Sequence, residues 1–447
     1  MVGRSGFFAL SFGSIVGSGW IVLLGEWLRL AAPGGALLAL LTGGMLMAAV
    51  GMCYAELAAR MPRGGGELRF ALDTLGPRVA FPVGWFLTLF LVAISAFEGT
   101  ALPWLASLLQ PQMPTTTVYR VLGEPVTAYG MTIGCLGAAL ICVINLSGVQ
   151  VSVLFQRLVT YSFIAVMTVL IVAGFVYGQT DHLRPWFTPP GGKSWLLGFS
   201  WLFATCAMLL YGFQTSLYLI EERAPQVSVR AATGSMVLGI VAAAVFYAAI
   251  VLSAGSIIPW HSLLDAELPS VAAFDALKPG AGIGKVVLIV AIFSLAKTWN
   301  AVLMMASRLI LAQAQAGLLP AALGRVDARR KTPTNAILLV TAATLIGIFL
   351  GRGALVPIVN MATICVAMTI VLMLIVLIQQ KRREPRSPGF AVPASRLVIP
   401  VCLIGAVVMA VFALFQPLWV QRGIPLEWKL IASWAAVGLL FRTLTRR

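Results

Sequence analysis

The residues best suited to chemistry stand near the start of the chain, where three glycines and two serines fall close together. The run is Gly13-Ser14-Ile15-Val16-Gly17-Ser18-Gly19. It lies inside an apolar segment, residues 7–31, that is long enough to cross a bilayer. Because each glycine costs roughly 1 kcal/mol relative to alanine in a helix, the run predicts an interruption of that helix. In hydrocarbon, unwound backbone is tolerated only where it is buried in protein or lines a cavity.

An interrupted helix at mid-membrane presents two kinds of free backbone group. The amides of its second half could bind an anion, and the carbonyls of its first half could bind a cation. Here the amides are those of Gly17, Ser18 and Gly19, and the carbonyls are those of Ser14 and Ile15. Together they would form a site for a zwitterion. The alternative is that the small residues only allow close helix packing, and the run taken alone supports both interpretations equally.

A second interruption is indicated in the apolar segment 197–220. A glycine and small polar residues fall at its mid-depth, in the run Leu209-Leu210-Tyr211-Gly212-Phe213-Gln214-Thr215-Ser216. Two interrupted helices at corresponding places in two halves of a chain indicate an inverted-repeat transporter with its site between the halves. Leu209, Tyr211 and Gly212 therefore join the candidate binding residues, with carbonyls that would help to hold an ammonium group.

The elements that must position these residues are membrane helices. The 447-residue chain is 60% hydrophobic and only 10% charged, which excludes a set of soluble domains, and its long uniformly apolar runs are not barrel strands. We predict an all-α integral membrane protein in one domain, 1–447, with a first repeat at 6–177, a second at 197–379 and two additional helices at 397–443. The twelve predicted spans are about 6–31, 36–58, 82–108, 129–147, 153–177, 197–220, 233–257, 284–313, 335–351, 354–379, 397–416 and 428–443.

Charge and cysteine usage exclude several other classes. The net charge of +16 is carried mainly by one set of loops, which predicts that both termini are cytoplasmic and does not call for nucleic acid. The six cysteines stand singly in apolar runs and the two histidines fall in loops, so we expect no metal, no cofactor and no disulfide framework. The spans hold no catalytic set of an acid, a nucleophile and a histidine, so we do not expect an enzyme.

Ionisable residues in or near the spans are the remaining candidates. Glu98 and Lys297 lie deep within segments 82–108 and 284–313, and such residues are functional candidates by default. Glu26 and Arg29, one helical turn apart near the outer end of the first span, predict an ion pair at the interface. Acids at cytoplasmic helix ends are expected to hold inner loops through nearby arginines; they are Glu56, Glu221 and Glu222.

Five motifs in order make the chain resemble the amino acid–polyamine–organocation permeases, which share a LeuT-like fold. The motifs are residues 13–19, Tyr54-Ala55-Glu56-Leu57 with residues 62–67, Ile144-Asn145-Leu146-Ser147-Gly148-Val149, Tyr211-Gly212-Phe213 with Glu221-Glu222 and Pro225, and Ser307-Arg308-Leu309 with Gly317-Leu318-Leu319-Pro320 and Thr332-Pro333. The resemblance covers nearly the whole chain and implies a 5+5 inverted repeat with broken helices 1 and 6. The chain departs from the family at Gln214, where an acid is frequent, and in the fifth helix, where the lysine of some members is absent.

The resemblance also implies roles for the two buried charges. The third helix of the family lines the substrate pocket, so Glu98 could pair with a substrate ammonium. In sodium-coupled relatives the first and eighth helices hold a cation, so Lys297 could replace that ion and couple transport to protons. The alternative is that Glu98 and Lys297 neutralise each other within the scaffold.

The expected function is secondary active transport of amino acids or related organic amines across the cell membrane by alternating access. Proton coupling is favoured because Lys297 would repel a sodium ion nearby. Amine exchange and sodium-coupled symport stay open as alternatives. From other functional classes, a channel or a nutrient-sensing receptor on the same scaffold stays open as well.

Overall fold

The computed structural model describes residues 1–110, 112, 116–351, 353, 355–385, 389–420 and 423–445. Apart from one hairpin and several short 3-10 helices, the regular structure in this part is α-helical. The elements are α1 (Arg4–Ile15), α2 (Gly19–Val22), α3 (Leu24–Arg60), α4 (Gly66–Leu75), α5 (Pro77–Leu109), β1 (Thr117–Val121), β2 (Glu124–Thr127), α6 (Ala128–Leu146), α7 (Val149–Tyr177), α8 (Trp195–Leu209), α9 (Thr215–Tyr218), α10 (Val229–Ile257), α11 (Pro269–Asp275), α12 (Ile283–Gln315), α13 (Thr334–Ile348), α14 (Leu355–Arg383), α15 (Ser395–Val420) and α16 (Leu426–Thr445).

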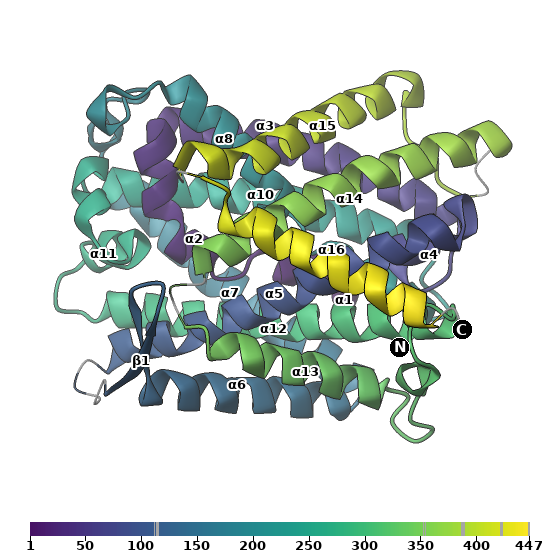
Figure 1. Ribbon diagram of the computed structural model, residues 1–447. Coiled ribbons are helices and arrows are strands. Elements are labelled where there is room, and N and C mark those ends of the chain that lie inside the picture. Colours follow the sequence, from purple (N-terminus) through teal and green to yellow (C-terminus); the bar gives the residue numbers. More distant parts are fainter. Residues whose placement is uncertain are drawn as a thin grey trace.

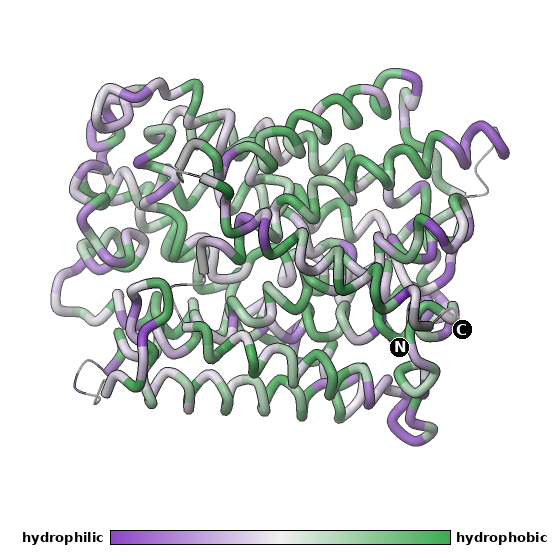
Figure 2. Tube along the Cα trace, viewed as in Figure 1, coloured by the Kyte–Doolittle hydropathy of each residue, from purple (hydrophilic) through white to green (hydrophobic). Residues whose placement is uncertain are grey.

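The long helices lie side by side in one bundle (Figure 1). Both chain ends and α4 lie at one end of the bundle, which we call the termini face, and the β1–β2 hairpin and α11 lie at the other, the hairpin face. Hydrophobic residues fill the middle of the bundle and hydrophilic residues gather at its two ends (Figure 2). That distribution is the one expected of helices that cross a bilayer.

Nine segments within the described ranges are long and apolar enough to span a membrane. Helices α8 and α13 are apolar but have only 15 residues each. The all-helical, multi-span class predicted from composition is thus confirmed, and the count of twelve stays a prediction. Helix α1 lies inside the bundle, packed against α10, α7 and α12. These contacts place the first interruption inside the bundle as well.

Both predicted interruptions are present. The first separates α1 from α2 at Val16 to Ser18, and the continuous α3 that follows is bent at Ala32, where φ is 54° immediately before Pro33. The bend falls between the first two predicted spans, 6–31 and 36–58. The other interruption separates α8 from α9, with Gly212 at φ 122° in between. A left-handed backbone is reached without steric cost only by glycine, which explains the residue at that point.

Two details differ from prediction. The sequence predicts a surface loop with short helices for the linker 109–128, but the linker contains an antiparallel hairpin closed by Leu122 and Gly123, both at positive φ. Alternating β-branched and aromatic residues around a two-residue turn favour a hairpin there. The predicted Glu26–Arg29 pair is also wrong, because the Arg29 guanidinium donates instead to the carbonyl of Leu264 at 2.7 Å.

The acids at the termini face do hold its loops. Glu56 accepts hydrogen bonds from Arg60 at 2.7 Å and from Lys381 at 2.9 Å, which joins the end of α3 to the end of α14. Glu222 pairs with Arg308 of α12 at 2.9 Å, as the prediction required. Glu221 differs, since it accepts from the backbone amide of Gly64 at 2.8 Å and not from an arginine.

Candidate functional site

The two interruptions meet at a small cavity of about 70 Å³ near the middle of the bundle. Its walls come from α1, α2, α5, α8, α10, α12 and α14, and from the unwound residues of both interruptions. All nine predicted binding residues line this one cavity: Ser14, Ile15, Gly17, Ser18, Gly19, Glu98, Leu209, Tyr211 and Gly212. Residues more than 190 positions apart in sequence are thereby brought together, as an inverted-repeat site requires.

The free amides of the first interruption belong to Ser18 and Gly19, which donate to no acceptor in the part of the chain that the structure describes. The Gly17 amide differs, because it donates to the Ile15 carbonyl at 3.1 Å. A Cβ atom on Gly17 would lie 2.8 Å from the Thr298 hydroxyl oxygen, whereas on Gly19 the nearest atom would be a Leu209 methyl at 3.3 Å. Gly17 therefore permits close packing against α12, and the other two residues present amides to the cavity.

The carbonyls of the first interruption are largely occupied. The Tyr247 hydroxyl on α10 donates to the Ile15 carbonyl at 3.0 Å. From α12, Ser294 donates to the carbonyls of Val16 and Gly17 at 3.0 and 2.9 Å. The Ser14 carbonyl accepts no hydrogen bond from the described residues and lies against Gly212, where an added Cβ would come within 2.9 Å of it. Of the two carbonyls predicted to meet an ammonium group, only that of Ser14 is free.

Lys297 reaches the same interruption from α12 and is fully buried. Its amine donates to the Gly13 carbonyl at 3.2 Å and also to the Val16 carbonyl. The amine lies 4.8 Å from the centre of the Phe163 ring on α7, within the range of a cation–π contact. Lys297 does not line the cavity, but its neighbour Thr298 does, and the Thr298 hydroxyl donates to the Gly13 carbonyl at 3.1 Å.

Glu98 lies on α5, is 3% exposed and accepts a hydrogen bond from the Ser18 hydroxyl at 3.3 Å. Its carboxylate thus stands next to the free amides of the first interruption. Among the described residues Glu98 and Lys297 form no ion pair, because the lysine amine is held by carbonyls. The cavity therefore combines two free backbone amides with a carboxylate, and an amine lies just behind its wall.

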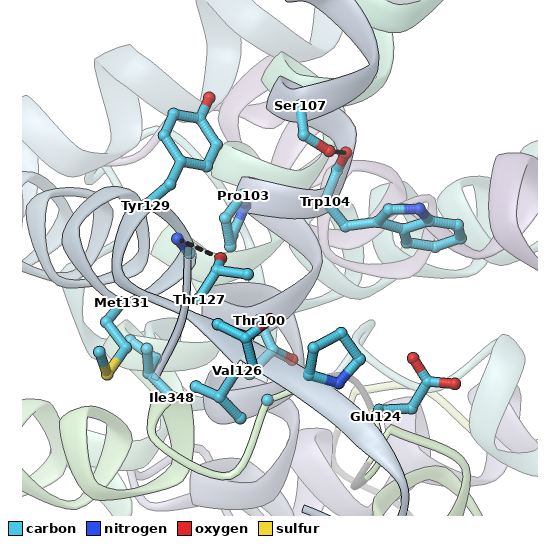
Figure 3. A pocket seen from close by; sticks show the side chains of 14 residues that line it. Thr100, Pro103, Trp104, Ser107, Glu124, Val126, Thr127, Tyr129, Met131 and Ile348 are labelled. Carbon is cyan, nitrogen blue, oxygen red and sulfur yellow. Dashed lines mark hydrogen bonds between the residues drawn. The ribbon is translucent and has the colours of Figure 1, made fainter. Parts of the chain in front are cut away.

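A second cavity, of about 250 Å³, opens toward the hairpin face between α5, α6 and the hairpin (Figure 3). It contains none of the predicted site residues, although Thr100 on its wall lies two positions after Glu98. The Thr127 hydroxyl, which accepts the Gly130 amide at 3.0 Å, fixes the start of α6 beside it. This cavity holds no cluster of charges comparable to the central one in the described ranges.

Three contributors to the central site were missed from the sequence. Ser294 stands three residues before Lys297 and four before Thr298, which makes it a neighbour of both on α12, and that helical spacing could have identified the serine and the threonine. The sequence gives less indication that Tyr247 belongs to the site, because it is a single aromatic residue in an apolar span. Its hydroxyl needed a partner once buried, but the sequence does not say which carbonyl supplies it.

The arrangement defines a class before any comparison is made: a membrane protein with a small central site at two interrupted helices. Comparison with known proteins then gives the family. A family model described as amino acid permease matches residues 3–441, and the chain belongs to that family. It is a multi-pass membrane transporter and not an enzyme.

Individual relatives are distant but extensive. The chain is 27% identical over 446 residues to a methylthioribose transporter of Bacillus subtilis (strain 168), covering 96% of this chain and 90% of that one. It is 23% identical to a branched-chain amino acid permease of the same organism, covering 94% and 89% of the two chains. It is 28% identical to cationic amino acid transporter 4 of Mus musculus, covering 86% of this chain and 60% of the longer relative.

Proposed function

We propose that this protein is a secondary active transporter of small amino acids or organic amines that works by alternating access. The observation that carries the proposal is the Lys297 amine, held by the Gly13 and Val16 carbonyls at the helix interruption beside the cavity. A cation at this position favours the unwound backbone, and a lysine supplies one without an added ion. Loss of its proton would remove that support, which is why proton coupling is favoured over sodium coupling.

In this proposal the carboxylate of an amino acid binds the amides of Ser18 and Gly19, and its α-ammonium group faces the free Ser14 carbonyl. A cationic side chain, or the amine of a substrate without a carboxylate, faces Glu98. The cavity volume of about 70 Å³ supports a small substrate, since pockets for drug-sized ligands have roughly 300–1,000 Å³. Residues 6–177 and 197–379 are the two halves of a 5+5 repeat with twelve spans in all. The termini face is cytoplasmic, and the membrane is the cell membrane.

The experiment is uptake by the purified full chain in liposomes. A panel of neutral and basic amino acids, simple amines and methylthioribose is offered under an inward proton gradient, a sodium gradient or neither. Methylthioribose is included because a relative bears its name. Uptake of an amino acid or amine that rises with the proton gradient and ignores sodium supports the proposal. Sodium-dependent uptake would contradict proton coupling and show that sodium is the coupling ion. Uptake of methylthioribose alone would contradict the proposed substrate class.

The alternatives are separated in the same liposomes. Counterflow in which internal substrate is required, with no response to either gradient, identifies an exchanger. A flux that does not saturate and shows no counterflow identifies a channel. Binding of an amino acid without any flux identifies a receptor.

A further inference from the structure

A buried carboxyl group that the proposed coupling does not use lies between the cavity and the termini face. Glu67 stands in the first turn of α4 and is fully buried. The Tyr211 hydroxyl, on the cavity wall, donates to Glu67 Oε1 at 2.8 Å. Glu67 Oε2 has no partner among the described residues, and the buried hydroxyls of Tyr54 and Tyr218 have none either. One oxygen of a buried acid is thus left facing unsatisfied hydroxyls.

The backbone before Glu67 forces this burial. Gly65 and Gly66 both have positive φ, 108° and 53°, which turns the chain into the bundle. A Cβ on Gly66 would lie 2.7 Å from the ring of Tyr218, so the start of α4 is pressed directly onto the residues of α9. Helix α4 therefore closes over the unwound segment from the termini face, and Glu67 lies within that closure.

The cations of this region are engaged with other acids. No lysine, arginine or histidine in the described ranges forms an ion pair with Glu67. The charged and polar groups of the elements around α4 are committed as follows: Arg60 and Lys381 to Glu56, Arg308 to Glu222, Arg69 to Asp73 on α4 itself, Glu221 to the Gly64 amide, and Gln380 of α14 to Thr74. The groups that face Glu67 are the hydroxyls of Tyr54, Tyr211 and Tyr218.

An ionised carboxylate without a counter-ion is costly to bury, whereas a neutral carboxyl needs only ordinary hydrogen bonds. The neutral form suits the geometry, since Oε1 accepts from Tyr211 and a proton on Oε2 could be donated to a tyrosine oxygen. Burial raises the pKa of Glu67 and outweighs the opposite effect of the backbone and tyrosine hydroxyl groups around its carboxyl group. The closed arrangement and the protonated carboxyl therefore stabilise each other.

We propose that Glu67 is a second proton-binding site, placed between the cavity and the termini face. It holds a proton while α4 packs on the unwound segment through Tyr211. When that contact opens and water enters, the O–H bond of the carboxyl breaks and the proton passes to water at the termini face. The direction of release rests on the proposed transport function and orientation, whereas the bound proton rests on the contacts of Glu67 alone.

The test is infrared titration of the purified full chain in lipid, without substrate. We expect a carboxylic acid C=O band at neutral pH that is absent from Glu67→Gln and retained in the control Glu221→Gln, whose carboxylate is at the surface of the same region. Tyr211→Phe keeps Glu67 but removes the donor to Oε1, so the same band should move to higher frequency. If Glu67→Gln does not fold, the shift in Tyr211→Phe still identifies the band.

A wild-type spectrum at neutral pH with no band that responds to either Glu67→Gln or Tyr211→Phe would overturn the proposal. Because the titration uses no substrate and no flux, it succeeds or fails independently of the proposed function. If the chain shows the band but transports nothing, the proton site at Glu67 is supported and the proposed transport function is contradicted. If the chain transports but lacks the band, the transport function is supported and the proton site is contradicted.

Discussion

The two interrupted helices achieve the same unwinding in opposite ways. The first, between α1 and α2, is held by other helices: α12 supplies Ser294, Lys297 and Thr298, and α10 supplies Tyr247, all donating to its carbonyls. The second, between α8 and α9, closes largely on itself. The Gln214 side-chain oxygen accepts the Gly212 amide at 2.9 Å, and the Thr215 hydroxyl donates to the Gly212 carbonyl at 2.8 Å.

The difference shows which interruption can respond to a change of charge and which can respond to movement of a neighbouring helix. Carbonyls held by an amine depend on the charge of that amine, so the first interruption is suited to sensing a proton or a cation. A turn that satisfies its own backbone does not need such a charge. One of its outward contacts is the hydrogen bond from the Tyr211 hydroxyl to Glu67, which links it to α4 and the termini face. Gln214 fits this account, because its neutral side chain accepts the Gly212 amide without adding a charge to the turn.

The largest expected effect is loss of proton-driven uptake in Lys297→Ala. Removing the amine leaves the Gly13 and Val16 carbonyls without their charged donor, and a hydrogen bond to a charged group contributes roughly 1.5–3 kcal/mol. Uptake driven by a pH gradient should vanish while equilibrium exchange of substrate persists. Lys285→Ala, at the exposed start of the same helix, is the matched control and should transport normally. Unaltered proton-driven uptake in Lys297→Ala would remove this residue from the coupling.

The second interruption should be most sensitive at Gly212. Alanine there would require a strained backbone at φ 122° and would place Cβ 2.8 Å from the backbone of Ser14. Backbone strain costs on the order of 1–3 kcal/mol and overpacking about as much again. We expect a lower Tm and weaker substrate binding by about a hundredfold or more. Gly234→Ala on α10, where an added Cβ meets nothing within 4 Å, is the control and should keep wild-type Tm and affinity.

Charge selection at the first interruption should depend on Glu98. Glu98→Gln keeps the shape of the side chain and removes its charge, and loss of one partner from a buried ion pair costs roughly 3–5 kcal/mol. Affinity for amines and basic amino acids should fall by on the order of a hundredfold, and neutral amino acids should be little affected. Competition binding of both ligand classes measures this, with Glu26→Gln as the exposed control. Equal losses for both classes would assign Glu98 to support of the site or to proton carriage.

These contrasts also separate what the sequence could predict from what it could not. The interruptions and the buried charges could be recognised from the sequence because clustered glycines weaken a helix and charges are costly inside a membrane. The helical class could be recognised because bilayer-spanning helices require long apolar runs. The hydrogen-bond donors to the first interruption could not be predicted, since a tyrosine such as Tyr247 or a serine such as Ser294 is common in apolar spans. Only the fold shows which carbonyl each one meets. Glu67 was readable only as part of a family motif, and its burial depends on α4 turning inward at Gly65 and Gly66.

The smallest expected effect is a pH dependence of stability that comes from Glu67. Because burial raises its pKa above the ordinary value of 4.5, the folded chain binds more proton than the unfolded chain between that value and the raised one. The stabilising contribution is therefore complete below pH 4.5 and is lost as the pH rises through the folded pKa. Each unit of pKa difference corresponds to about 1.4 kcal/mol.

Thermal unfolding of the full chain over a series of pH values measures this contribution. The wild-type Tm should fall as the pH rises above 4.5, and Glu67→Gln should flatten that part of the curve. Glu221→Gln changes a carboxylate at the surface of the same region and keeps Glu67, so it should retain the slope. A Glu67→Gln curve parallel to that of the wild type would mean that Glu67 is ionised in the folded chain, and that α4 closes over the second interruption without a proton.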